Sequence, residues 1–431
     1  MISTIPFDVA CTITDHLDGD LTSLASCTLL CSTWLLASRR HLFRKLDVWS
    51  NLEDGSFATF DEFLKGSRHV AEYIQELYLG WDRRLWKQSE APLAYPLRGK
   101  KPARISLRRL HCIVQQLPLL RKLVFDEVGY TTDGFVVPSF PARPAIDNLE
   151  INTPHFRADR DDPLDVLRVL GIFSEIGVVS LSAWWEGALT VKPEVLMRDF
   201  VYPGPVEIHD LKTHHISSSW LSLVSCAILK TGSLRKGGTL KTLTLHLDSS
   251  QWDEIAVVVG WLLREAGQNL RFIRLDPLSL LEDHDGSNRL WGRSNFSCTA
   301  LVSLVLNLDY SCYTRNELGI RLGKELGFRI YQELLANDCP PFLERITFRV
   351  KLYKELEDRD DLFSMPWNTM EEVLLNSGTL KEVVIDFSTG SYDGREKFCE
   401  MMPTLDKKGM LTFRYHEVGD AKSSYWWDLP F

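Results

Sequence analysis

A short apolar template recurs ten times between residues 74 and 385 of this 431-residue chain. Each copy has an apolar residue, two variable residues, a second apolar residue, one variable residue and a third apolar residue. The alternation that ends each copy predicts a β-strand whose apolar residues face a core. The copies are Ile74/Leu77/Leu79, Leu120/Leu123/Phe125, Ile146/Leu149/Ile151, Val178/Leu181/Ala183, Met197/Phe200/Tyr202, Leu240/Leu243/Leu245, Leu270/Ile273/Leu275, Leu301/Leu304/Leu306, Leu343/Ile346/Phe348 and Leu380/Val383/Ile385.

Helical apolar spacing separates several of these strands. It is found in residues 105–117, 163–177, 251–267 and 317–337. A strand and a helix of about thirty residues together cannot close a core, so such units stack into an α/β solenoid with a parallel sheet on its concave side. We therefore predict one irregular solenoid over residues 74–431, in which the C-terminal aromatics around Trp426 and Trp427 cap the open end or, alternatively, form a short partner-binding tail.

The first fifty residues have a different pattern, which predicts three short helices. Ile5-Pro6 opens the first helix, Gly19-Asp20 offers a break and an N-cap, and a second apolar series leads to Trp34. So short a segment cannot bury all of this apolar surface by itself. Residues 1–50 therefore need a partner or the following domain, to which residues 51–73 provide a linker helix.

Both regions resemble parts of one protein family. The stretches IPFDVACTITDHL, CTLLCSTW and SRRHLFRKLDV resemble an F-box, although Ile-Pro replaces the usual Leu-Pro and Leu30-Cys31 the usual Val-Cys. The apolar template resembles the strand half of a leucine-rich repeat, but the usual Asn or Cys after it is absent from all ten copies. Fungal F-box proteins with degenerate repeats share this looseness. The resemblance implies a non-catalytic adaptor that docks on the Skp-type adaptor of a cullin–RING ubiquitin ligase and selects a protein substrate.

Two sets of candidate binding residues follow from this resemblance and from strand alternation. The residues expected to pack on the Skp-type adaptor are Ile5, Pro6, Val9, Ile13, Leu17, Leu24, Leu30 and Trp34. Variable strand positions point to the concave face, where aromatic residues and Arg are common anchors of protein interfaces. The candidate substrate-binding residues there are Trp184, Thr244, His246, Phe272, Arg274, Asn307, Arg345 and Arg349.

An alternative interpretation is a scaffold outside any ligase, whose N-terminal helices only cap the solenoid. Exposure separates the two interpretations. In an adaptor, several of the eight N-terminal residues remain accessible as an apolar surface. In a capped scaffold, they are buried against Phe43, Leu46 and the first repeats.

Composition and motifs narrow the function further. The net charge of −9 argues against nucleic acid, and there is neither an eighteen-residue apolar run nor a signal-peptide pattern. The nine scattered cysteines suit a reducing compartment, so we expect a cytoplasmic or nuclear protein. Nucleophile-elbow, phosphate-loop and dinucleotide motifs are missing, and Cys27, Cys31 and His41 are better explained by packing than by metal binding. We therefore expect neither an enzyme nor a bound cofactor.

Overall fold

A computed structural model describes most of the chain. The described residues are 5–50, 55–81, 103–131, 143–152, 163–182, 198, 200, 202, 204–216, 218–234, 237–247, 252–276, 298–309, 335, 340–351, 363, 365–387 and 394–415. The chain divides into two compact units, which we describe separately. Unit 1 comprises Met1–Thr190 and Asp199–Val206, and unit 2 comprises Val191–Arg198 and Glu207–Phe431.

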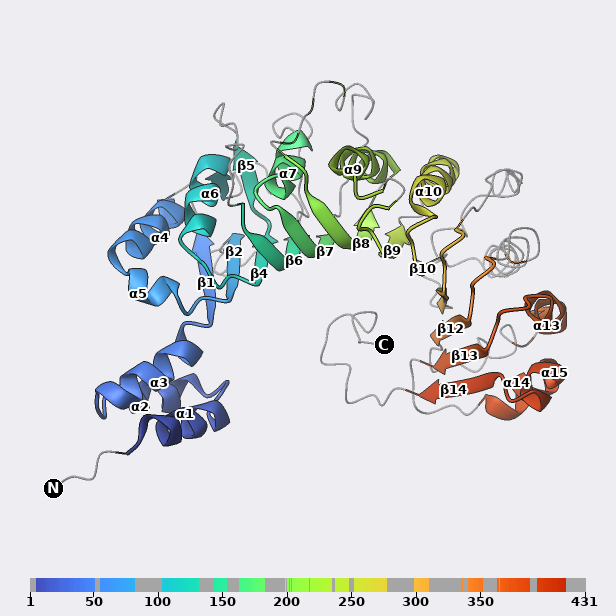
Figure 1. The fold of residues 1–431 in the computed structure, drawn as a ribbon, viewed down its shortest axis with the longest axis horizontal. Coiled ribbons are helices and arrows are strands. Elements are labelled where there is room, and N and C mark those ends of the chain that lie inside the picture. Colours follow the sequence, from blue (N-terminus) through green and yellow to red (C-terminus); the bar gives the residue numbers. More distant parts are fainter. Residues whose placement is uncertain are drawn as a thin grey trace, which may run out of the picture. The chain divides into compact units, whose positions relative to one another are not determined.

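Unit 1 begins with three short helices, as the sequence predicts. They are α1 (Phe7–His16), α2 (Leu21–Thr28) and α3 (Ser32–Leu42), and we call residues 5–42 the three-helix module (Figure 1). The turn between α1 and α2 forms because Gly19 adopts a φ of +93°, which residues with a Cβ rarely do. Asp20 then caps α2 by accepting a hydrogen bond from the backbone N–H of Ser23.

The rest of unit 1 is a parallel sheet with helices on one face (Figure 1). The strand order is β1 (Lys45–Ser50), β2 (Glu76–Trp81), β4 (Lys122–Asp126), β6 (Ala145–Asn152) and β7 (Glu175–Ser182). The helices are α4 (Gly55–Gly66), α5 (Arg68–Ala71), α6 (Leu107–Gln115) and α7 (Pro163–Leu170), and β3 (Arg104–Ser106) pairs with β5 (Gly129–Thr131). Lateral pairing aligns the buried apolar residues Leu77, Leu123, Leu149 and Val179.

Unit 2 repeats this arrangement. Its parallel strands, in order, are β8 (Glu207–Ile216), β9 (Thr242–Leu247), β10 (Phe272–Asp276), β11 (Ser303–Asp309), β12 (Arg345–Lys351), β13 (Glu382–Phe387) and β14 (Leu411–Tyr415). The described helices are α9 (Ser218–Thr231), α10 (Trp252–Ala266), α13 (Trp367–Leu375), α14 (Arg395–Met401) and α15 (Pro403–Lys407). A row of fully buried residues crosses the sheet: Leu211, Leu243, Ile273, Leu304, Ile346 and Val383.

These observations confirm the α/β class and the parallel sheet. Eight of the ten apolar triplets mark strands with the predicted residues buried: those beginning at Ile74, Leu120, Ile146, Leu240, Leu270, Leu301, Leu343 and Leu380. In the described part of the chain, no helix is long and apolar enough to cross a membrane.

Two triplets were placed wrongly. In β7 the residues that face the core are Ile176, Val179 and Leu181, two positions before the predicted Val178/Leu181/Ala183, because apolar residues occupy both faces of this strand. Phe200 and Tyr202 are buried but belong to no strand. The strand there is β8, which the template missed because a threonine, Thr213, takes its third apolar position.

Other differences concern elements that the template does not cover. Strands β1 and β14 were not predicted, and the helix expected over 163–177 ends at Leu170, because β7 begins at Glu175. The linker contains two helices, α4 and α5, instead of one. Nearly all of the helix expected over 317–337, and the aromatic tail with Trp426 and Trp427, lie outside the described residues.

Candidate protein-binding surfaces

The three-helix module has a small core of its own. Ala10 of α1 packs with Trp34 and Ala37 of α3, and the half-buried Cys11 and Cys27 lie against them. Leu24 of α2 is also fully buried. This core consists mainly of small side chains around Trp34, so it uses only part of the apolar surface that the module carries.

Ion pairs also link α1 and the turn after it to α3. Arg40 forms an ion pair with Asp15, and the His41 ring lies 3.0 Å from the Asp15 carboxylate and 3.2 Å from that of Asp18. Arg44 reaches Asp18 at 3.2 Å. These exposed contacts join the end of α1 and the turn after it to the end of α3 and to Arg44, and they add to the packing of Ala10 against Trp34 and Ala37.

A set of large apolar side chains on the module remains in solvent. The most exposed is Leu29, of which 86% is accessible, followed by Leu30 with 65%. We call these residues the exposed apolar set: Ile5, Phe7, Val9, Ile13, Leu21, Leu29, Leu30 and Leu36. Ile5, Val9 and Ile13 follow one another at four-residue spacing and so share one side of α1. This concentration in so short a segment marks a surface that is suited to an apolar partner.

The eight predicted adaptor-binding residues differ in their exposure to solvent. Ile5, Pro6, Val9, Ile13 and Leu30 are exposed, and Leu17, the C-cap of α1, is half-buried. Leu24 and Trp34 are 0% and 9% exposed and belong to the interior of the module, where they support the other residues instead of meeting a partner. The prediction omitted Phe7, Leu21, Leu29 and Leu36, which flank the predicted stripes and are equally exposed.

Seven of the eight predicted substrate-binding residues, all except Trp184, lie on the face of the sheet away from the helices, which we call the outer face. Strand alternation places them there, opposite core residues such as Leu306. Most of them are buried, which is not expected of a surface open to a substrate. Phe272 is half-buried, Arg345 is exposed, and Trp184 lies outside the described residues. The others are buried: Thr244, His246, Arg274, Asn307 and Arg349.

Ion pairs account for part of this burial. Arg349 of β12 and Asp386 of β13 are lateral neighbours, and the Arg349 Nε donates to Asp386 Oδ2 at 2.9 Å with both side chains 4% exposed. Four residues earlier on both strands, Arg345 meets Glu382 at 2.6 Å in a more exposed setting. The His214 and His246 rings stack at 4.9 Å between β8 and β9. Sequence spacing alone does not show these cross-strand partners, since each pair spans more than thirty residues.

The outer face of unit 1 is more open. Tyr78 lies beneath Lys45, whose Nζ is 4.3 Å from the ring centroid, while Lys122 forms an ion pair with Glu150 at 2.7 Å. The ring of Trp49 lies across Gly80, so closely that a Cβ at Gly80 would come within 2.3 Å of it. This face therefore presents accessible aromatic and charged groups.

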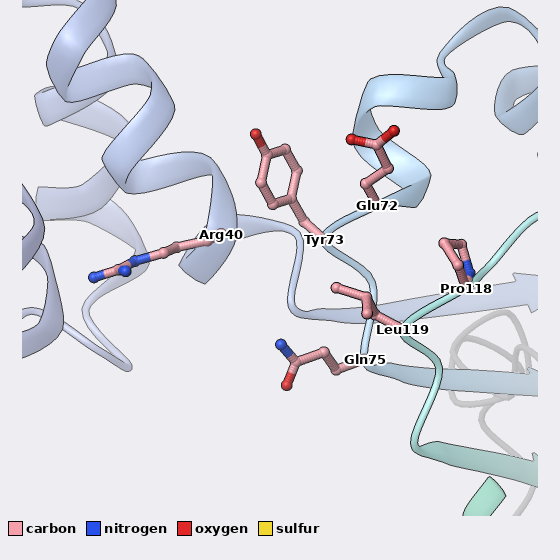
Figure 2. Close-up of a pocket in the computed structure, with 6 residues that line it drawn as sticks. All are labelled: Arg40, Glu72, Tyr73, Gln75, Pro118 and Leu119. Atoms are coloured by element: carbon pink, nitrogen blue, oxygen red, sulfur yellow. The ribbon is translucent and has the colours of Figure 1, made fainter. Parts of the chain in front are cut away.

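A hollow of about 530 Å³ lies where α3 approaches the segments that lead into β2 and β4. Glu72, Tyr73 and Gln75 precede β2, Pro118 and Leu119 precede β4, and the Arg40 side chain extends away from them (Figure 2). The Arg40 guanidinium is engaged by Asp15. Among the residues described, no cluster of His, Cys, Asp and Glu could hold a metal ion.

The sequence matches no model of a known protein family, and it has no significant match among curated proteins.

Proposed function

We propose that the chain is a substrate-recognition adaptor of a cullin–RING ubiquitin ligase. In this proposal the three-helix module is an F-box that binds the Skp-type adaptor, and the strand–helix repeats form a degenerate leucine-rich-repeat solenoid that holds a protein substrate. The observation that carries the proposal is the exposed apolar set of the module. It combines with the F-box-like order of residues in the first fifty positions.

The exposure of the predicted contacts favours this function over the capped scaffold. A cap would bury Ile5, Val9 and Leu30 against the first repeats, whereas these three side chains stand in solvent. Exposing so many large apolar groups has a free-energy cost, which a partner recovers by removing their surface from water at about 25 cal/mol per Å². The packing of α1 on α3, with the ion pairs between them, positions these groups before a partner arrives.

The implied mechanism is proximity. The adaptor performs no chemistry; it holds the substrate close to the ubiquitin that the ligase transfers, which raises the effective concentration of the reacting groups. The short connection supports this role, because β1 begins at Lys45, three residues after α3 ends at Leu42. The backbone N–H groups of Gln75 and Glu76 both donate to Arg44 O, which ties that connection to the start of β2.

A binding experiment with the full chain tests this function. Ile5→Asp, Val9→Asp and Leu30→Asp, combined in one variant, place charge on the exposed side chains and leave the core residues Leu24 and Trp34 unchanged. We expect the variant to lose affinity for a purified Skp-type adaptor by about 100-fold or more.

The matched control adds three charges to exposed apolar residues outside the module: Phe63→Asp, Val302→Asp and Phe342→Asp. We expect this control to bind the adaptor as well as the wild type does. If both variants lose binding equally, or if the folded wild-type chain does not bind at all, the proposal is wrong and the scaffold interpretation is preferred.

A further inference from the structure

Three lateral neighbours form a polar row across the outer face of unit 2. They are Asn307 of β11, Arg349 of β12 and Asp386 of β13, which the strand register places side by side. All three are at most 3% exposed. Buried polar groups require hydrogen-bond partners, because removing them from water without replacement costs about 1–3 kcal/mol for each group.

The three residues of this polar row differ in whether their buried polar atoms have hydrogen-bond partners. Arg349 and Asp386 are joined by their ion pair. Asn307 is 0% exposed, yet neither its Nδ2 nor its Oδ1 has a hydrogen-bond partner in the part of the chain that the structure describes. Asn307 therefore carries both an unused donor and an unused acceptor next to a neutralised ion pair.

This combination limits the chemistry of a matching ligand. The Asn307 carboxamide offers one acceptor and one donor side by side. A carboxylate supplies only acceptors and an ammonium group only donors, so either of them leaves half of the carboxamide unmet. A main-chain peptide group carries an N–H and a C=O and can satisfy both atoms. The charges of Arg349 and Asp386 neutralise each other, so a ligand at Asn307 does not need to be charged.

We propose that Asn307 binds the main chain of an extended peptide segment, with the Arg349–Asp386 pair bordering the site. This inference rests on the proposed function in one respect: it takes the peptide segment to be part of the protein substrate. Because Asn307 has no exposed surface, binding of a peptide requires a rearrangement that opens this position. Association is therefore slow, below about 10⁵ M⁻¹ s⁻¹.

A stability measurement on Asn307→Leu provides the first test. Leucine has a similar size but no groups that need hydrogen bonds, so we expect the melting temperature of the full chain to rise by about 2 °C or more. Asn148→Leu, at a half-buried outer-face position of unit 1, is the control and should shift the melting temperature by less than about 1 °C. A lower melting temperature for Asn307→Leu would show that the carboxamide is already satisfied in the folded chain, and would overturn the proposal.

Peptide binding provides the second test. Random twelve-residue peptides displayed on phage are selected on the wild-type full chain, and the enriched sequences are synthesised and titrated. We expect Asn307→Leu to weaken their binding at least 10-fold and Asn148→Leu to leave it unchanged. N-methylation of one main-chain amide should cause the same loss, without adding to that of Asn307→Leu.

Three results would overturn the assignment: no enriched peptide, equal binding by Asn307→Leu, or no amide whose methylation reproduces its effect. The Asn307→Leu chain is also tested for binding to the Skp-type adaptor. Loss of peptide binding with retained adaptor binding supports a peptide site that is separate from the module. Failure of the wild type to bind the adaptor would concern the proposed function alone.

Discussion

The three-helix module and the outer face of unit 2 distribute polar and apolar groups in opposite ways. On the module, large apolar side chains such as Leu29 and Leu30 stand in water. On the outer face of unit 2, side chains that prefer water, such as Arg349 and Asn307, are withdrawn from it. Both arrangements cost free energy in the isolated chain. The two proposed partners follow this difference: an apolar surface for the module and a hydrogen-bonding main chain for unit 2.

The largest expected effect concerns the buried charge of unit 2. Asp386→Ala leaves the Arg349 guanidinium buried without its carboxylate, which should lower the free energy of unfolding by about 3–5 kcal/mol. Urea denaturation of the full chain measures this change. Glu382→Ala is the control on the same strand, since its pair with Arg345 is more exposed and should be worth less than about 1 kcal/mol. Equal losses for the two variants would show that burial does not distinguish the pairs.

The next effect separates the interior of the module from its surface. Leu24→Ala removes a fully buried side chain and should destabilise the module by about 2–5 kcal/mol. Leu30→Ala removes an exposed one and should change stability by less than about 0.5 kcal/mol while weakening adaptor binding. Hydrogen exchange across α1 to α3 reports the stability of each variant. If Leu30→Ala is as destabilising as Leu24→Ala, Leu30 belongs to the core instead of the binding surface.

The prediction with the smallest effect on stability compares the reactivity of two cysteines, one in the module and one in unit 2. Cys31 is exposed beside Leu30, and a hydrogen bond from the Trp34 backbone N–H lowers the pKa of its thiol. Burial raises the pKa of Cys298 in unit 2 to about 12. At pH 7.5 we expect iodoacetamide to alkylate Cys31 on the order of 100-fold faster than Cys298, as measured by mass spectrometry.

Two further results sharpen this prediction. The adaptor at saturation should slow the alkylation of Cys31 and leave that of Cys298 unchanged; no protection of Cys31 would contradict the proposed docking surface. Because burial raises the folded-state pKa of Cys298 above the unfolded value of about 8.5, the neutral thiol stabilises the fold below that pH. This contribution should decline as the pH rises from about 8.5 toward 12.

Strand positions were predictable where three apolar residues shared one face and the other face was polar. Leu240, Leu243 and Leu245 predict β9, because the residues that alternate with them in the strand are polar and leave only one side for the core. The same reasoning failed at β8, where Thr213 takes a core position that the template reserves for an apolar residue. In β7 apolar residues on both faces leave the register ambiguous, and only pairing with β6 resolves it.

The candidate sites were less predictable, because burial depends on partners that are distant in sequence. The four-residue spacing of Ile5, Val9 and Ile13 shows that they share a side of α1, but it does not show whether another element covers them. Trp34 fits the same kind of stripe and is buried. Likewise, the partnership of Arg349 with Asp386 follows from the register of β12 and β13, which the local sequence does not contain.

The most direct test of the account is a calorimetric titration of the full wild-type chain with a purified Skp-type adaptor. We expect saturable one-to-one binding with a negative heat-capacity change, the mark of apolar surface leaving water. The variant with Asp at positions 5, 9 and 30 should give no binding heat under the same conditions. Absence of binding by a wild-type chain that melts cooperatively would contradict the adaptor function.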